Sequence, residues 1–129
     1  MKKIIILLVF SASLMSCKKS SEKIAQDNVT FYTKVWDVAI NEGKIDVLDT
    51  AYSTDIVLYT SPEIKGVADA KAYYANFVTG FSNRQFIVKD MFAQGEKVTK
   101  YWQFKGTHTG TFMGIPATGK TIHIEGCTI

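Results

Sequence analysis

The segment KGTHTGTFMGIPATGKTIHIEG, residues 105–126, decides the fold of this chain. Within it, Gly114 to Thr121 match the phosphate-loop template G-x-x-x-x-G-K-[ST]. A phosphate loop needs a strand before it and a helix after it, because the N–H groups of the helix N-terminus hold the phosphates. Thr121 is instead followed by IHIEGCTI, which is rich in β-branched residues and predicts a strand. We therefore interpret the match as accidental and residues 109–120 as a loop between two strands.

Two further strands are predicted before this loop. RQFIVKDMFAQ, residues 84–94, and VTKYWQFKGTH, residues 98–108, both alternate between apolar and polar residues. The letters GEK between them fit a tight turn. The second half of the chain therefore predicts a hairpin followed by a third strand.

The first half of the chain has helical periodicity. Apolar residues recur at helical spacing over residues 24–40, and Gly43 stands where that helix would end. Shorter helical patterns cover residues 45–52 and 66–81, with a β-rich run at residues 55–60 between them. The order predicts an α+β fold in which three helices cover one face of a curved, mostly antiparallel sheet.

The N-terminus has the layout of a secretory signal. Lys2 and Lys3 precede the apolar run of residues 4–10, which is too short to span a bilayer. LMSC at residues 14–17 resembles a bacterial lipobox. We expect residues 1–16 to be a signal peptide, and a plain secretory signal is the alternative.

The lipobox reading makes Cys17 a lipidated N-terminal residue. Residues 17–23 would form a polar tether, and residues 24–129 would form a single domain held at the bacterial cell envelope. Each buried CH₂ of the acyl chains contributes about 0.8 kcal/mol, so several chains anchor firmly. The membrane is thus one expected partner.

Charge and cysteine content exclude several classes of function. Without residues 1–16 the chain keeps 13 Lys and Arg against 12 Asp and Glu, so nucleic acid is not an expected partner. Cys127 has no remaining cysteine to pair with, which excludes a disulfide within the lipidated monomer. His108 and His123 are predicted on opposite faces of the sheet, so we expect no metal site, and nothing indicates a cofactor.

Most of the chain from about Val29 to Ile129 resembles the SnoaL-like polyketide cyclases, also called ester cyclases, of the nuclear transport factor 2-like superfamily. The most specific part is GTHTGTFMGIPATGK, residues 106–120. The resemblance implies a cone of three helices around a bent sheet with an apolar pocket inside. It also implies a further strand after residue 129, so we expect the domain to be truncated at its C-terminus.

The resemblance also implies where catalytic groups would lie. The family's pocket carboxylate, the acid and base of an aldol closure, falls at Thr128, and a histidine on the first strand falls at Tyr59. Threonine cannot act as that acid or base at neutral pH. Of the family pattern, Trp102 and the His108 of GTHTG remain.

Strand alternation predicts the pocket lining independently. Residues of one parity on neighbouring strands should face the helices together. On the third helix, Tyr74 and Phe77 belong to an aromatic stripe that is mainly core but could also line the cavity. The predicted ligand-binding residues are Trp102, Phe104, Ile124, Thr128, Tyr74 and Phe77.

Three residues are candidates for catalysis. His108 could be a base, a ligand donor or an anchor for the adjoining loop. Tyr59 could donate its phenol to a ligand carbonyl, although strand tyrosines are often only packing. Asp90 shares a parity with Phe86 and Val88, so burial could make it a base, while its position near a strand end allows ordinary solvation.

Two functions remain open. The first is a cyclase or isomerase that moves a proton next to the carbonyl of a small apolar compound. The second is a membrane-tethered protein that holds such a ligand without changing it, as the replacements at Tyr59 and Thr128 suggest. A homodimer formed through the outer face of the sheet is a further possibility, which would require an apolar patch there.

Overall fold

The computed structural model of the protein describes residues 21–129. The expected signal peptide, the expected lipidation site Cys17 and the first residues of the expected tether lie outside this range. Helix α1 spans Ser21–Trp36, so it begins three residues before the predicted start, and the last residues of the predicted tether are helical. No helix within residues 21–129 is long and apolar enough to cross a membrane.

The three predicted helices are present. Helix α1 continues into a π-helical turn, η1, at Asp37–Asn41, and Gly43 follows with a φ of 74° that favours glycine. The second helix, η2 at Ile45–Thr50, is a 3₁₀-helix and ends two residues before its predicted end. Helix α2 spans Val67–Gly80.

The predicted hairpin and third strand form one antiparallel sheet. Strands β3 (Phe81–Gln94), β4 (Lys97–His108) and β5 (Thr121–Thr128) lie in the order β3-β4-β5. Because β5 begins at Thr121, the segment that matches the phosphate-loop template is a loop between two strands. The β-rich run at residues 55–60 contributes only a two-residue strand, β1, to a separate small ribbon. That ribbon consists of β1 (Val57–Leu58) and β2 (Ile64–Lys65).

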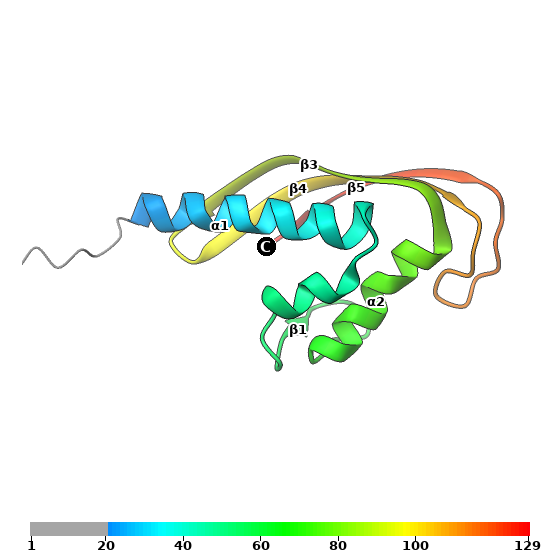
Figure 1. Ribbon diagram of the computed structural model, residues 1–129, viewed down its shortest axis with the longest axis horizontal. Helices are drawn as coiled ribbons and strands as arrows, with labels where there is room; N and C mark the ends of the chain where they lie inside the picture. Colours follow the sequence, from blue (N-terminus) through cyan, green and yellow to red (C-terminus); the bar gives the residue numbers. More distant parts are fainter. Residues whose placement is uncertain (1–20) are drawn as a thin grey trace, which may run out of the picture.

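The helices lie together against the sheet (Figure 1). Helix α1 runs along the sheet and packs mainly on β3, while α2 leads directly into the start of β3. The buried core lies between these layers and consists of Val35, Trp36, Ala39, Ile40, Leu48, Phe81 and Phe104. The predicted α+β architecture is confirmed.

A bulge in β3 changes which side chains face the helices. The register pairs Val88 with Trp102 but Asp90 with Tyr101, so Lys89 is an extra residue on β3. Alternation is therefore reversed beyond it, and Asp90 is exposed, with its carboxylate accepting a hydrogen bond from the Met91 N–H at 2.8 Å. The prediction that Asp90 shares the apolar face is wrong, because that prediction assumed unbroken alternation.

Asn41 fixes the end of the first helical segment to β3. Its side-chain amide donates to the Phe86 carbonyl at 2.9 Å and accepts from the Phe86 N–H at 2.7 Å. These two bonds satisfy both backbone groups of one strand residue. They hold Phe86 beside Trp36, whose ring centroid is 5.5 Å from that of Phe86.

Candidate functional site

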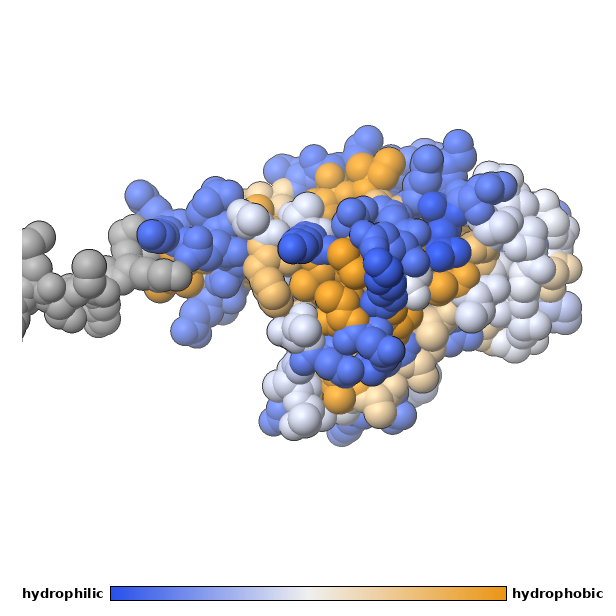
Figure 2. All heavy atoms as spheres, viewed as in Figure 1, coloured by the Kyte–Doolittle hydropathy of each residue, from blue (hydrophilic) through white to orange (hydrophobic). Residues whose placement is uncertain are grey.

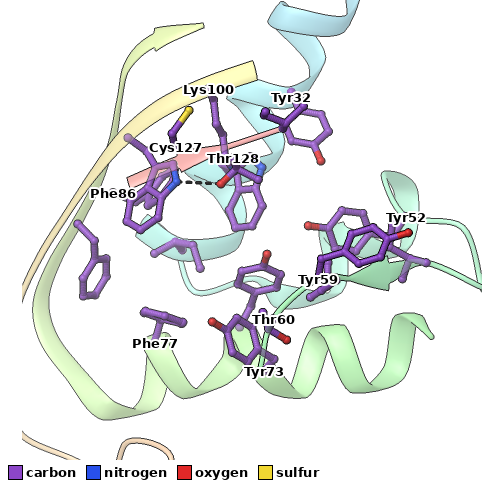
Figure 3. Close-up of a pocket in the computed structure, with 18 of the residues that line it drawn as sticks. Tyr32, Tyr52, Tyr59, Thr60, Tyr73, Phe77, Phe86, Lys100, Cys127 and Thr128 are labelled. Carbon is purple, nitrogen blue, oxygen red and sulfur yellow. Dashed lines mark hydrogen bonds between the residues drawn. The ribbon is translucent and has the colours of Figure 1, made fainter. Parts of the chain in front are cut away.

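A cavity of about 460 Å³ lies between the helices, the small ribbon and the sheet. Figure 3 shows Tyr73 and Phe77 entering it from α2, and Lys100 and Thr128 from the opposite, sheet side. On the face shown in Figure 2, hydrophobic residues lie among hydrophilic ones over the middle of the domain. A volume of this size suits a small organic ligand.

Aromatic rings make up most of the cavity wall. Trp36 meets Tyr74 edge to face, with ring centroids 4.7 Å apart, and Phe77 meets Phe104 in the same way at 5.4 Å. Such contacts leave each ring little freedom, because neighbouring rings block its rotation. The wall is therefore largely preformed, with an apolar surface for a ligand.

Gly126 makes room for one of these rings. A Cβ atom at Gly126 would come within 2.4 Å of the ring of Trp102, its partner in the β4–β5 register. The Trp102 indole N–H also donates to the Thr128 hydroxyl at 2.9 Å (Figure 3). Gly126 and Thr128 thus set the orientation of Trp102.

Three phenols gather at the helical side of the cavity. Burial raises the pKa of Tyr74 to about 12 and also raises the pKa of Tyr32. The pKa of Tyr52 is raised further, by burial first and then by the neighbouring phenols of Tyr74 and Tyr32. All three hydroxyls therefore stay protonated at neutral pH. Tyr52 is hydrogen-bonded to the other two phenols, so Tyr32 and Tyr74 are the ones that can donate to a ligand oxygen.

Lys100 is a charged residue that the sequence reasoning missed. It is only 3% exposed and lines the cavity from β4. Its ammonium lies 3.4 Å from the centroid of the Trp36 ring, and 5.4 Å from those of both Tyr32 and Phe86. Burial lowers the pKa of Lys100 to about 7, because the apolar surroundings disfavour its charged form.

The indole N–H of Trp36 is a further polar group of the wall. Trp36 is 3% exposed, and its Nε1 has no hydrogen-bond partner among residues 21–129. A buried donor without a partner costs about 1–3 kcal/mol, so most such groups are satisfied in folded proteins. Its Nε1 atom has almost no accessible surface, so it is enclosed by protein atoms and does not face a ligand in the cavity.

The cavity brings together most of the predicted ligand-binding residues. Tyr59 also lines it but is 87% exposed. Ile124 shares the register position of Phe104 but is 40% exposed and does not line the cavity, because β5 is the edge strand of the sheet. The predicted residues that line the cavity are Trp102, Phe104, Thr128, Tyr74, Phe77 and Tyr59.

His108 lies away from the cavity. It is 6% exposed, and its ring packs on Phe81 at 5.1 Å and on Phe112 at 6.4 Å. Its Nδ1 lies 3.1 Å from the Thr118 hydroxyl, across the loop that joins β4 to β5. It lies eight residue steps along β4 from Lys100, which is roughly 26 Å in an extended strand. His108 therefore does not line the cavity, and of the three roles considered for it this position fits the anchor of the loop.

Within residues 21–129, no group of three or more His, Cys, Asp or Glu residues could hold a metal ion. Cys127 is exposed and has a free thiol. It opposes Tyr101 in the register, and it is also one of the residues that line the cavity. The polar residues along the cavity are therefore the tyrosines, Thr128, Cys127 and Lys100.

The profile of the SnoaL-like polyketide cyclases matches residues 26–129. The chain belongs to this family. A SnoaL-like fold places helices around a pocket whose far wall is the sheet, as the geometry above shows. No curated protein matches the chain.

Solved structures agree with the SnoaL-like assignment. A protein of Jannaschia sp. CCS1 assigned as a SnoaL-like polyketide cyclase has a TM-score of 0.71 at 20% identity, over 81% of this chain and 75% of that one. AclR of Streptomyces galilaeus, assigned as a hydroxylase, has a TM-score of 0.64 at 25% identity, over 79% and 75%. A protein of Acidithiobacillus ferrooxidans assigned as a polyketide cyclase has a TM-score of 0.61 at 26% identity, over 85% and 78%.

Family and neighbours together support a cyclase-type function for this SnoaL-like protein. The hydroxylase assignment of AclR shows that this fold can carry more than one chemistry, so the residues of the site determine the reaction.

Proposed function

We propose that this SnoaL-like protein is a cyclase-type enzyme that moves a proton next to the carbonyl group of a small apolar compound. The observation that carries this proposal is a preformed aromatic cavity that also holds protonated phenols and a lysine with a pKa of about 7. Apolar walls would bind the carbon skeleton, and the polar groups would act on its carbonyl.

The chemistry follows from the arrangement of donors. A phenol such as Tyr74 can donate to the carbonyl oxygen and withdraw electron density from it. This makes a proton on the adjacent carbon easier to remove, and the resulting enolate can attack a second carbonyl within the same molecule. Lys100 is the group of the cavity that changes charge near neutral pH.

Hydrogen–deuterium exchange tests the proton transfer without knowledge of the natural substrate. 2-Tetralone is a small apolar ketone whose exchange at the carbon next to the carbonyl can be followed by NMR in D₂O. The protein should accelerate this exchange, and binding should quench the fluorescence of the two cavity tryptophans, Trp36 and Trp102. Binding without faster exchange would refute the catalytic proposal.

A matched pair of variants shows whether the cavity is responsible. Leu58 lines the cavity from β1, so Leu58→Trp should fill space there and reduce both the binding and the exchange of 2-tetralone. Lys65 belongs to the same small ribbon but is exposed and outside the cavity, so Lys65→Trp should leave both unchanged. Equal effects of the two variants would contradict a role for the cavity.

The second candidate is a protein that holds a small apolar ligand without changing it. One observation favours it: no Asp, Glu or His side chain of residues 21–129 lines the cavity. Mass spectrometry of the protein under native conditions should then show a retained apolar ligand. Rapid ligand turnover or accelerated exchange of 2-tetralone would exclude this purely binding role.

Attachment to the cell envelope is a proposal that both functions share. Lipid on Cys17 would place the cavity close to a membrane in which apolar compounds dissolve. Cys17→Ser should move the protein from the membrane fraction to the soluble fraction of a bacterial host, whereas Cys127→Ser should not. Release of neither variant, with no acyl chains detected by mass spectrometry, would contradict the anchor.

A homodimer through the outer face of the sheet also remains a proposal. Ile87, Phe92 and Tyr101 lie on that face and are 42%, 62% and 40% exposed. Sedimentation equilibrium of the protein and of a Phe92→Lys variant tests it. A dimer that Phe92→Lys dissociates would support pairing through this face, and a monomeric parent protein would refute it.

A further inference from the structure

Lys100 lies on β4 directly opposite the position on β5 where the family resemblance implies a carboxylate. In the β4–β5 register, Lys100 is the direct partner of Thr128, the residue at the position implied for that carboxylate. Directly opposed residues of antiparallel strands project from the same face. The amine therefore lies on the same face of the sheet, one strand away from where the acid and base would be expected.

In the described part of the chain, Lys100 lacks the carboxylate partners that other lysines of the protein have. Lys44 pairs with Glu42, and Lys71 pairs with two aspartates, both on the surface of the protein. Within residues 21–129, the ammonium of Lys100 makes no ion pair or hydrogen bond and meets only ring faces. Lysines are almost never buried without a partner, and unpaired buried ones are frequent at functional sites.

Among the described residues, the elements packed around Lys100 place no charged side chain against it. Strand β3 opposes it with Met91 and β5 with Thr128, and α1 faces it with the phenol of Tyr32. The other titratable groups that line the cavity are further phenols and the Cys127 residue. A buried amine in such surroundings readily gives up its proton and then has a free lone pair.

We propose that Lys100 is a nucleophile that condenses with the carbonyl group of a small apolar ligand to form a reversible imine. The nitrogen lone pair attacks the carbonyl carbon, and the C=O π electrons move to oxygen, which takes up a proton. The nitrogen then passes a proton to the new hydroxyl group, which leaves as water while the nitrogen lone pair forms the C=N bond, so the product is the protonated imine. The step is redox-neutral, and water reverses it.

The inference rests on the proposed function, because a protonated imine acidifies the adjacent carbon, whose proton that function moves. Only the neutral amine can attack a carbonyl. With a pKa of about 7, about half of the Lys100 side chains are neutral at pH 7. For an ordinary lysine, with a pKa of about 10.4, the neutral fraction at pH 7 is roughly one in 2,500. The protonated phenols of Tyr32 and Tyr74 are suitable donors to the departing oxygen.

A 1,3-diketone is a direct probe of this reaction. With an amine, 1-phenylbutane-1,3-dione loses one water and gives a conjugated enaminone that persists without a reducing agent. Incubated with the full-length protein at pH 7, it should add its own mass less one water to a single site. Peptide mapping should place the adduct on Lys100, and the rate of labelling should rise with pH around a midpoint near 7.

Three variants separate this proposal from nonspecific lysine labelling. Lys100→Met keeps an unbranched chain of similar length without the amine, and Lys100→Arg keeps a charge that stays protonated; both should abolish the adduct. Lys105 is on the same strand but exposed, so Lys105→Met should label like the parent protein. Adducts spread over surface lysines, or retained in Lys100→Met, would overturn the inference.

The two probes test imine formation and proton transfer separately. If the diketone quenches the fluorescence of the cavity tryptophans and 2-tetralone exchange is accelerated, but no adduct forms, the imine is refuted and the proton transfer stands. If neither probe binds, the proposed function fails with it. Circular dichroism of Lys100→Met shows whether that variant is folded, and Lys100→Arg provides a second test if it is not.

Discussion

Replacing Lys100 with methionine should remove a pH dependence of stability that the parent protein shows between pH 7 and pH 9. Lys100 is 3% exposed, and burial lowers its pKa to about 7 in the folded state. In the unfolded chain its pKa returns to about 10.4. Between these values the unfolded state binds more protons than the folded state, so the free energy of unfolding rises with pH.

The size of this effect follows from the two pKa values. Below pH 7 both states carry the proton, and the stability is independent of pH as far as Lys100 is concerned. From pH 7 to pH 9, linkage predicts a gain of about 2 kcal/mol in the free energy of unfolding. The buried tyrosines do not interfere, because their pKa values are raised and they titrate above this window.

Urea unfolding followed by tryptophan fluorescence at pH 7, 8 and 9 measures the effect. The quantity to compare is the change with pH in the parent protein minus that in Lys100→Met, since contributions of other groups cancel in the difference. Lys105→Met, on the exposed side of the same strand, should behave like the parent protein. A difference near zero for Lys100→Met would show that Lys100 is not desolvated, and the argument for a reactive amine would fail.

Three further substitutions test the framework of the site. Asn41→Ala should lower the free energy of unfolding by about 1–3 kcal/mol, because both backbone groups of Phe86 lose their partner. Gly126→Val should cost about 1–3 kcal/mol through its clash with Trp102 and should weaken probe binding. His108→Ala should lower the melting temperature, by the loss of its ring contacts, while diketone labelling stays unchanged. Urea unfolding, fluorescence quenching and mass spectrometry measure these outcomes.

Each of these substitutions has a control. Thr30→Ala removes an exposed side-chain contact on α1 and should be nearly neutral. Gly95→Asn lies at the hairpin turn, where no atom is within 4 Å and asparagine tolerates the φ of 59°. His123→Ala removes an exposed imidazole of β5. If a control destabilised the protein as much as its partner variant, the specific contacts named above would not be responsible.

Local patterns were sufficient for the helices and the sheet. Helical spacing, Gly43 and the GEK turn each reflect backbone constraints that act over a few residues. In the structure Gly43 has a positive φ, and β3 and β4 pair on either side of the GEK turn. The rejection of the phosphate loop rested on the strand-forming residues after Thr121, and β5 begins there. The short ribbon was beyond local reasoning, because pairing between β1 and β2 decides how much of residues 55–60 becomes a strand.

Pocket placement was predictable only where alternation was unbroken. On β4 the parity of Trp102 and Phe104 continues to Lys100, so the sequence did contain a signal for the buried amine, although lysine is normally read as exposed. On β3 the extra residue Lys89 reversed the alternation and moved Asp90 outward. The bulge has no local sequence signature that we can identify.

The walls of the cavity explain why an amine is tolerated where a carboxylate would not be. The faces of aromatic rings carry partial negative charge, so those of Trp36, Tyr32 and Phe86 attract an ammonium and would repel a carboxylate. Such contacts offset about 0.5–2 kcal/mol, whereas taking an ion out of water costs several kcal/mol. Burial therefore prevails, and the pKa of Lys100 falls to about 7 without the charged form being excluded. An amine balanced between its two forms near neutral pH can both attack a carbonyl and carry a proton, which are the two steps that an imine-forming, proton-transferring pocket requires.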